Sequence, residues 1–171
     1  MIKVTSFTPA LGLSIALASL VVFGLAACSS ESGPVLPDYP TCPGDACPCV
    51  DANDCACDTS SQCALQCGDS CAFECKEDSD CGAAGGNNSD LTCVEGTTCV
   101  LYAGDDSMVL CRAANCTIEV GAGSSVSCID RGECTVTCLG SCSVGCEGDS
   151  TICRYRCGAD GALMDGPGAC E

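Results

Sequence analysis

The chain has 171 residues, of which 23 are cysteine and none is histidine or tryptophan, and its 23 acidic residues against six basic ones give a net charge of −17. This acidity excludes simple electrostatic binding to nucleic acid, which requires a basic surface. The lack of histidine excludes histidine-based nucleophilic triads and histidine acid–base catalysis.

Residues 1–27 have the layout of an export signal peptide. Lys3 is followed by an uncharged apolar stretch, which ends in Leu-Ala-Ala-Cys at Cys28. This ending resembles the lipobox of bacterial lipoproteins, and the resemblance implies that cleavage makes a lipidated Cys28 the first residue. The alternative is an uncleaved transmembrane helix, because the stretch approaches the ~20 residues that span a bilayer.

The lipobox resemblance also implies a location. Two or more acyl chains on Cys28 would anchor the protein stably to a membrane. Ser29 follows the cysteine, and in this family a residue other than Asp there usually permits sorting to the outer membrane. We therefore expect a lipid-anchored protein of the bacterial cell envelope, at the outer membrane or cell surface rather than the inner membrane.

The remaining cysteines fit an exported, cross-linked protein. Lipidation of Cys28 would leave 22 of the 23, an even number that can pair completely. Export places them in an oxidising compartment, where disulfides persist. Cleavage would also remove Lys3 and leave a net charge near −18. Because the mature chain has few bulky apolar residues, we expect cross-links to replace part of an ordinary core.

Two short segments precede the main domain. Residues 28–41 contain three prolines and no periodicity, which predicts a flexible tether after the lipidated cysteine. Residues 42–56 are dense in cysteine but irregular, and we interpret them as an N-terminal cap, since the end units of repeat arrays are usually atypical.

Residues 57–171 form a repeat domain with a period near 18 residues. Eleven residues always separate the second cysteine of one pair from the first of the next, from Cys63–Cys75 to Cys134–Cys146. A fixed period of this size is typical of a stacked, quasi-linear array. We expect six coils, which begin at Cys57, Cys75, Cys93, Cys111, Cys128 and Cys146.

Within each coil, apolar residues alternate with polar ones on both sides of a glycine-rich or polar turn, as in Ile118 and Val126 around Gly121-Ala122-Gly123. A period of two predicts a strand, a turn and a second strand. Across coils this alternation forms two inward-facing apolar columns. One is Leu65, Ala83, Leu101, Ile118, Val136 and Tyr155, and the other is Phe73, Leu91, Val109, Val126 and Val144.

The predicted fold is therefore all-β: a small, disulfide-rich parallel β-solenoid. It resembles the disulfide-rich β-helices of insect antifreeze proteins, although the repeat length differs and the outward residues are too irregular for ice binding. A string of irregular disulfide-rich modules is the alternative.

Stacked coils bring cysteines within the distance that a disulfide tolerates, both along the stack and across the interior. The sequence leaves these two pairings open. Cys67 with Cys71 and Cys138 with Cys142 are present or absent together in a coil, which suggests that each pair bonds across its own turn. The disulfide candidates are Cys57, Cys63, Cys67, Cys71, Cys75, Cys81, Cys93, Cys99, Cys111, Cys116, Cys128, Cys134, Cys138, Cys142, Cys146, Cys153, Cys157 and Cys170.

A calcium site is the one cofactor that the sequence suggests. Residues 85–91 resemble once the glycine-rich pattern of calcium-binding β-rolls, but the third glycine is replaced by Asn88 and one residue is missing. Asp69, Asn87 and Asp105 would stack in successive turns. A solvated acidic turn is the alternative interpretation.

No residue stands out as catalytic, because the paired carboxylates fall in turns without an apolar pocket that would separate their pKa values. We expect a non-enzymatic, lipid-anchored envelope protein with a structural or interaction surface. The alternative is a module that binds cations such as calcium, or that buffers thiols or metals. The expected partners include the membrane, through the lipid anchor, and exclude nucleic acid. The sequence does not identify a protein or glycan partner.

Overall fold

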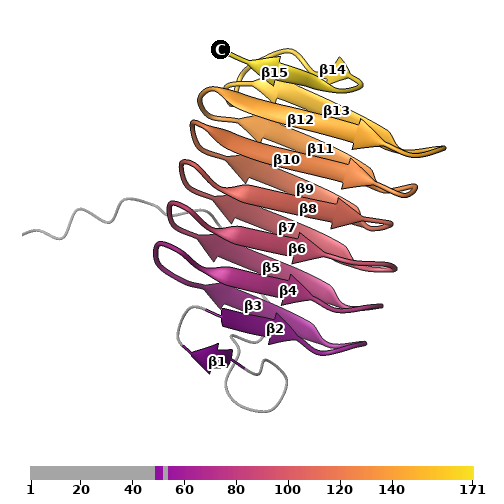
Figure 1. The fold of residues 1–171 in the computed structure, drawn as a ribbon. Helices are drawn as coiled ribbons and strands as arrows, with labels where there is room; N and C mark the ends of the chain where they lie inside the picture. The colour runs from indigo at the N-terminus through magenta and orange to yellow at the C-terminus, as the bar shows by residue number, and fades with distance from the viewer. Residues whose placement is uncertain (1–48, 52–53) are drawn as a thin grey trace, which may run out of the picture. The chain divides into compact units, whose positions relative to one another are not determined.

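The structure is a computed structural model that describes residues 49–51 and 54–171. These residues belong to one compact unit, residues 32–171. Every helix or strand in this described part is a β-strand, and the strands stack into two sheets (Figure 1). The predicted parallel β-solenoid is confirmed.

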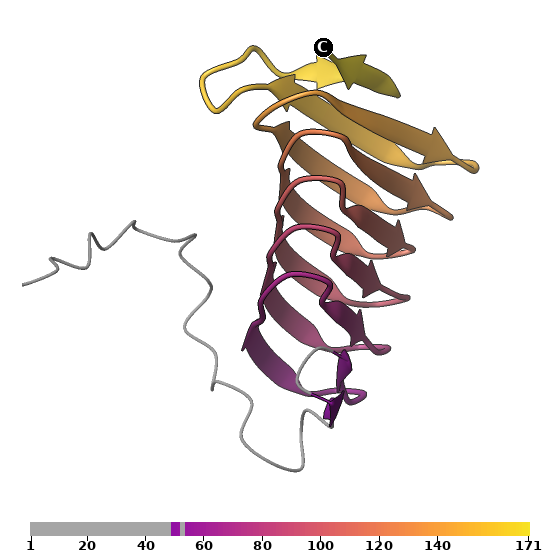
Figure 2. The same ribbon diagram turned by 60° about the vertical axis from the view of Figure 1, so that its left-hand side comes forward.

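From β2 to β13, consecutive strands alternate between the two sheets, so each coil contributes one strand to each (Figure 2). The parallel strands of the first sheet are β3 (Gln62–Gln66), β5 (Asp80–Gly85), β7 (Thr98–Ala103), β9 (Asn115–Val120), β11 (Glu133–Cys138) and β13 (Ile152–Cys157). Those of the second are β2 (Asp54–Cys57), β4 (Ala72–Cys75), β6 (Asp90–Cys93), β8 (Met108–Arg112), β10 (Ser124–Ile129) and β12 (Cys142–Glu147).

The register of the sheets matches the predicted columns. In the first sheet Leu101 pairs with Ala83 and Ile118, and in the second Val109 pairs with Leu91 and Val126. Because side chains alternate between the two faces of a strand, this register turns every column member toward the other sheet.

The core is a narrow layer between the sheets, filled by the apolar columns and by cysteines. Leu91, Leu101 and Val136 are fully buried. Full burial of a branched or aromatic side chain stabilises the fold by about 1.5–3 kcal/mol. Leu65 and Tyr155, in the first and last coils, are only partly buried. The middle of the stack is therefore its best-packed part.

Each coil is closed by two sets of turns, which lie at opposite edges of the sheets. The first turns run from the first sheet to the second and comprise residues 67–71, 86–89, 104–107, 121–123 and 139–141. The second turns return to the first sheet and comprise residues 58–61, 76–79, 94–97, 113–114, 130–132 and 148–151. Asn88 in a first turn and Asp78 in a second turn have φ of 56° and 58°. Asn and Asp tolerate this left-handed conformation better than most residues.

The last coil ends in a chain reversal. After β13, the short strands β14 (Met164–Asp165) and β15 (Gly168–Cys170) pair antiparallel with β13 and β12. Short strands that cover a sheet edge limit pairing with another chain. At the other end, β1 (Cys49–Asp51) pairs antiparallel with β2, whose parallel stacking on β4 begins at Asp54, three residues before the predicted coil start.

Candidate functional site

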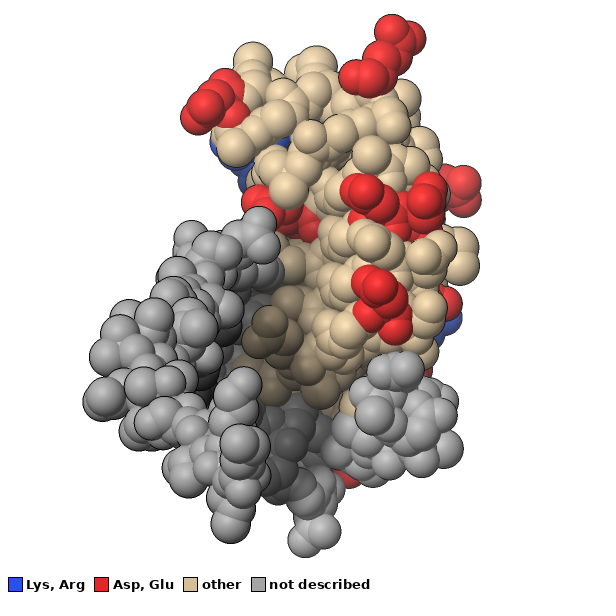
Figure 3. Space-filling model, turned by 90° about the vertical axis from the view of Figure 1, so that its left-hand side faces the viewer, with Lys and Arg blue, Asp and Glu red and all other residues tan. Residues whose placement is uncertain are grey.

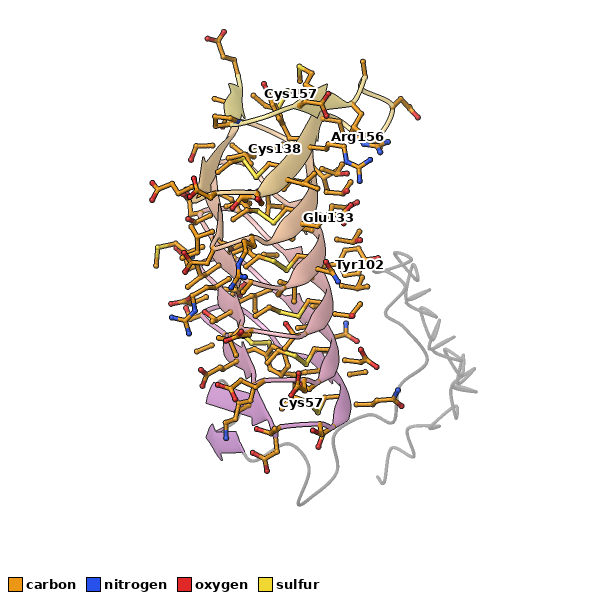
Figure 4. The ribbon with its side chains drawn as sticks, turned by 90° about the vertical axis from the view of Figure 1, so that its right-hand side faces the viewer. Cys57, Tyr102, Glu133, Cys138, Arg156 and Cys157 are labelled. Carbon is orange, nitrogen blue, oxygen red and sulfur yellow. A yellow bond between two sulfur atoms is a disulfide. The ribbon has the colours of Figure 1, made fainter. Side chains whose placement is uncertain are left out.

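Disulfides occupy the interior at every coil. Nine bonds pair all the cysteines between residues 57 and 171, and each bond lies within one coil rather than along the stack. The cysteines thus pair across the interior of a coil and not along the stack, which are the two pairings that the sequence left open. Figure 4 shows the sulfur atoms in a column between the two layers of ribbon.

Six of these bonds, which we call the staple disulfides, cross the second turns. Their Cα–Cα distances are between 5.9 and 6.7 Å. That range lies within the reach of an ordinary disulfide. The staple disulfides are Cys57–Cys63, Cys75–Cys81, Cys93–Cys99, Cys111–Cys116, Cys128–Cys134 and Cys146–Cys153.

Three further bonds, which we call the turn disulfides, lie at the opposite edge. Cys67–Cys71 and Cys138–Cys142 close first turns with Cα–Cα distances of 5.9 Å, and they are the two pairs that joint presence in the sequence suggests. Cys157–Cys170 takes the equivalent place in the last coil, because Cys157 pairs in register with Cys138 and Cys170 with Cys142. Its second cysteine comes from the reversed strand β15.

Buried serines replace the turn disulfides in the middle coils. Ser89, Ser107 and Ser124 are at most 2% exposed. The Ser89 N–H donates to Ser107 Oγ at 3.0 Å, and the Ser107 N–H donates to Ser124 Oγ at 3.1 Å. The hydroxyls donate in turn to backbone carbonyls of the turns, as Ser89 Oγ does to Gly86 O at 2.8 Å. This serine ladder satisfies buried backbone groups that would otherwise destabilise the turns.

The predicted calcium residues do stack in successive turns, but their oxygens bind the backbone. Oδ1 of Asp69 accepts the N–H of Asn87 at 2.8 Å, and Oδ1 of Asn87 accepts the N–H of Asp105 at 2.8 Å. Asp105 Oδ1 continues the ladder to the N–H of Ala122 at 2.7 Å. Gly104 precedes Asp105 because a Cβ there would collide with Asn87. These oxygens therefore already have a structural role in the turns.

Figure 3 views this first-turn edge, where carboxylates are interspersed with uncharged residues. In the part of the chain that the structure describes, the only groups of three acidic or cysteine ligand atoms within 4.8 Å of one another consist of cysteines. All of those cysteines are in disulfides. The acidic turns thus carry charge without a cluster of carboxylate ligands.

A groove of about 550 Å³ lies over the second turns. Its charged lining includes Arg112 and Arg131 among four carboxylates, those of Glu77, Glu95, Asp130 and Asp149. These residues belong to no motif that the sequence suggests. Their even spacing, one turn per coil, was the available signal, but it becomes a surface only once the turns are known to stack on one edge.

At the start of this edge, Lys76 forms an ion pair with Asp58 of the preceding coil, with Nζ 2.9 Å from Oδ1. The hydrogen bond from Lys76 to Asp58, with the attraction of that carboxylate, raises the pKa of Lys76 above its ordinary value of 10.5. Glu74 contributes in the same direction. Both partners are exposed, so the pair positions the turn rather than stabilising the fold strongly.

The outward face of the second sheet has a small, partly exposed apolar patch at Met108 and Leu110. Met108 is 60% exposed and lines a hollow of about 310 Å³ together with Leu110, Thr92 and Ser125. Small side chains follow on β10 and β12, where Ser125 and Ser127 pair with Ser143 and Gly145. The alternation in residues 108–112 was a signal for these positions.

The outward face of the first sheet is irregular. Figure 4 shows Tyr102, Glu133 and Arg156 pointing away from the disulfide column on the same side of the stack. Glu133 accepts an ion-paired hydrogen bond from Arg154 at 3.0 Å. In the register of this sheet, Tyr102 pairs with Glu119, and Thr137 pairs with Arg156, so the outward residues differ from coil to coil.

Several predicted features lie outside the described residues: the signal peptide 1–27, lipidated Cys28, the tether 28–41 and most of the cap 42–56. No helix among the described residues is long and apolar enough to cross a membrane. Comparisons with protein families, with curated proteins and with solved structures found no match.

Proposed function

We propose that this chain is a non-enzymatic, lipid-anchored protein of the bacterial cell envelope, whose disulfide-stapled solenoid holds an interaction surface away from the membrane. The Leu-Ala-Ala-Cys ending at Cys28 and the proline-containing residues after it support the anchor and the tether. The solenoid supports the surface, because stacked repeats present long regular faces to partners.

The observation that carries this proposal is that each of the six coils has a disulfide across its second turn. Disulfides persist in oxidising compartments and are rare where thiols are kept reduced. A chain that depends on them in each coil must fold after export. The disulfides and the export signal thus support the same destination independently.

The surface favours association over catalysis. Two carboxylates of the first turns, those of Asp69 and Asp105, accept hydrogen bonds from backbone N–H groups of the next coil, so they serve as turn acceptors. The hollow beside Met108 instead offers exposed apolar surface, rimmed by Asp90. A partner with an apolar contact and basic groups would complement that face.

The anchor is tested by expressing the full chain and the variant Cys28→Ala in a Gram-negative host, followed by membrane fractionation and intact mass. The wild type should begin at Cys28, carry the added mass of a diacylglycerol and an acyl chain, and sediment with membranes. Cys28→Ala should lose both the acyl mass and the membrane association. A wild-type chain that keeps Met1 would contradict the proposal and favour a transmembrane segment.

Two variants at the next residue serve as matched controls. Ser29→Ala should leave the lipid mass and the outer-membrane location unchanged. Ser29→Asp should leave the lipid mass unchanged but move the protein toward the inner membrane. If all three chains occur in the inner-membrane fraction, the outer-membrane location is wrong although the lipid anchor stands.

A further inference from the structure

The last two coils bring four cysteines together. The turn disulfides Cys138–Cys142 and Cys157–Cys170 lie in adjacent coils. In the first sheet Cys138 pairs in register with Cys157, and in the second Cys142 pairs with Cys170. Figure 4 shows Cys138 and Cys157 near each other at the C-terminal end of the stack. The four residues thus form the corners of a square. Two of its sides are the disulfides Cys138–Cys142 and Cys157–Cys170, and the other two are the unbonded neighbours Cys138 with Cys157 and Cys142 with Cys170.

The sulfur atoms of these two disulfides are close enough to exchange. Sγ of Cys138, Cys142 and Cys170 all lie within 4.8 Å of one another, a separation that leaves no room for another atom between them. Disulfides isomerise when a thiolate attacks a neighbouring disulfide sulfur. A thiolate at Cys170 would therefore lie next to its target, the Cys138–Cys142 bond.

One corner of the square is open to solvent. Cys157 is exposed, whereas Cys138, Cys142 and Cys170 are at most 5% exposed. The other sulfur groups within 4.8 Å, which include Cys81, Cys99 and Cys116 of the staple disulfides, consist of buried cysteines only. Among the described residues, the C-terminal square is thus the one sulfur group that adjoins a bond accessible to an external thiol.

The fold also keeps Cys170 in place when its disulfide to Cys157 opens. Strand β15 pairs antiparallel with β12 through Cys142–Cys170, Ser143–Ala169 and Val144–Gly168. These backbone contacts do not depend on Cys157. Cys170 would therefore stay opposite Cys142 after the bond to Cys157 is broken.

We propose that this square is a thiol–disulfide exchange site for exported dithiols, with Cys157 as the entry sulfur and Cys170 as the relay. A thiolate of the dithiol attacks Cys157 Sγ, forms a mixed disulfide and releases Cys170 as a thiolate. Cys170 then attacks Cys142 Sγ, which forms Cys142–Cys170 and releases Cys138 as a thiolate that takes a proton from water.

The second thiol of the dithiol resolves the mixed disulfide. It bonds to the first sulfur of the dithiol and releases Cys157 as a thiol. The dithiol has then lost two electrons and two protons, and the protein has gained thiols at Cys138 and Cys157. Reoxidation by an external disulfide would join these two neighbours and leave both bonds along the stack. The strand spacing of about 4.8 Å permits this ladder pairing.

The experiment treats the fully oxidised full chain with less than one equivalent of dithiothreitol, then quenches with acid, alkylates and maps peptides. Cleavage at Arg156 and before Asp165 separates Cys157 from Cys170. The proposal predicts alkylated Cys138 and Cys157 and a new cross-link between the Cys142 and Cys170 peptides. Alkylation of Cys157 and Cys170 alone, opening of another disulfide first, or no reaction would each overturn it.

Two double variants sharpen this test. Cys138→Ser/Cys142→Ser should lose the new cross-link and give alkylated Cys157 and Cys170. Cys67→Ser/Cys71→Ser removes the turn disulfide that belongs to no such sulfur group, and it should keep the cross-link. This proposal depends on the disulfides and not on the lipid anchor, so loss of acylation in Cys28→Ala would leave it unchanged.

Discussion

The first turns are held closed in two ways: by disulfides near the ends of the stack and by hydrogen-bonded serines in its middle. Cys67–Cys71, Cys138–Cys142 and Cys157–Cys170 close their coils with covalent bonds. Ser89 and Ser107 in the coils between them use buried hydroxyls and backbone groups of the neighbouring coils.

The choice between a disulfide and a serine follows the number of coils that stack against the turn. A middle turn has a coil on each side, so its N–H and C=O groups find partners along the stack, whereas a coil near an end has fewer such contacts and frays more easily. A bond within the coil needs no neighbour. The cysteines therefore occur where stacking alone holds the turn least well.

The largest effect is expected when a cysteine turn loses its bond. Cys67→Gly/Cys71→Ala should lower the free energy of unfolding by about 2 kcal/mol, because the disulfide closes a short loop and its loss gives the unfolded chain more freedom. Cys67→Gly/Cys71→Ser copies the second coil, where Gly85 and Ser89 stand at these places, and should lose about 1 kcal/mol less. Chemical denaturation of both variants measures the difference, and equal stabilities would show that a serine cannot substitute for the bond here.

The next effect concerns the serine ladder. Ser107→Ala leaves the buried N–H of Ser89 without its acceptor, which should cost about 1–2 kcal/mol. Ser125→Ala, at an exposed position on β10, is the matched control and should change the unfolding midpoint little. If the two variants unfold alike, the hydroxyl of Ser107 does not hold the middle turns.

A smaller effect is expected at the outer ladder of the same turns. Asn87→Asp would place three carboxylates in adjacent coils and should destabilise the fold by about 0.5 kcal/mol through like-charge repulsion. Added sodium chloride should remove most of this loss, since exposed charges are screened. Thermal unfolding in low and high salt measures it. A stabilisation by calcium that exceeds the effect of salt at equal ionic strength would instead support the calcium site suggested by the sequence.

The smallest effect is expected at the second turns, where Lys76 pairs with Asp58. The raised pKa of Lys76 means that folding favours the charged amine. Its stabilising contribution is thus fully present below the ordinary value of 10.5 and disappears as the pH rises through the raised value. Lys76→Gln should have a slightly lower unfolding midpoint than the wild type at pH 8, and this difference should shrink as the pH rises above 10.5. A difference that stays constant with pH would mean that the lysine acts through its aliphatic stem.

The regular middle of the domain could be predicted from the sequence because two signals coincide there. The cysteine spacing fixes the period, and the alternation around Ile118 and Val126 fixes which face is buried. Once these are known, the parallel register follows, since a shift by one residue would expose a whole apolar column.

The ends and the outward faces could not be predicted in the same way. The reversal that places Cys170 opposite Cys142 depends on the irregular residues 158–169, which carry no repeat. The hollow beside Met108 and the groove beside Arg112 each combine residues from several coils. Likewise, the stacking of Asp69, Asn87 and Asp105 was predictable, but their binding to backbone N–H groups depends on the shape of the turns.

The intact mass of the exported full chain, alkylated before and after reduction, shows whether disulfides staple the solenoid. We expect no alkylation before reduction and 22 alkylated cysteines after it, since Cys28 would be blocked by lipid and the rest of the 23 paired. Several cysteines that react before reduction, or only after a chelator is added, would mean that disulfides do not hold the coils.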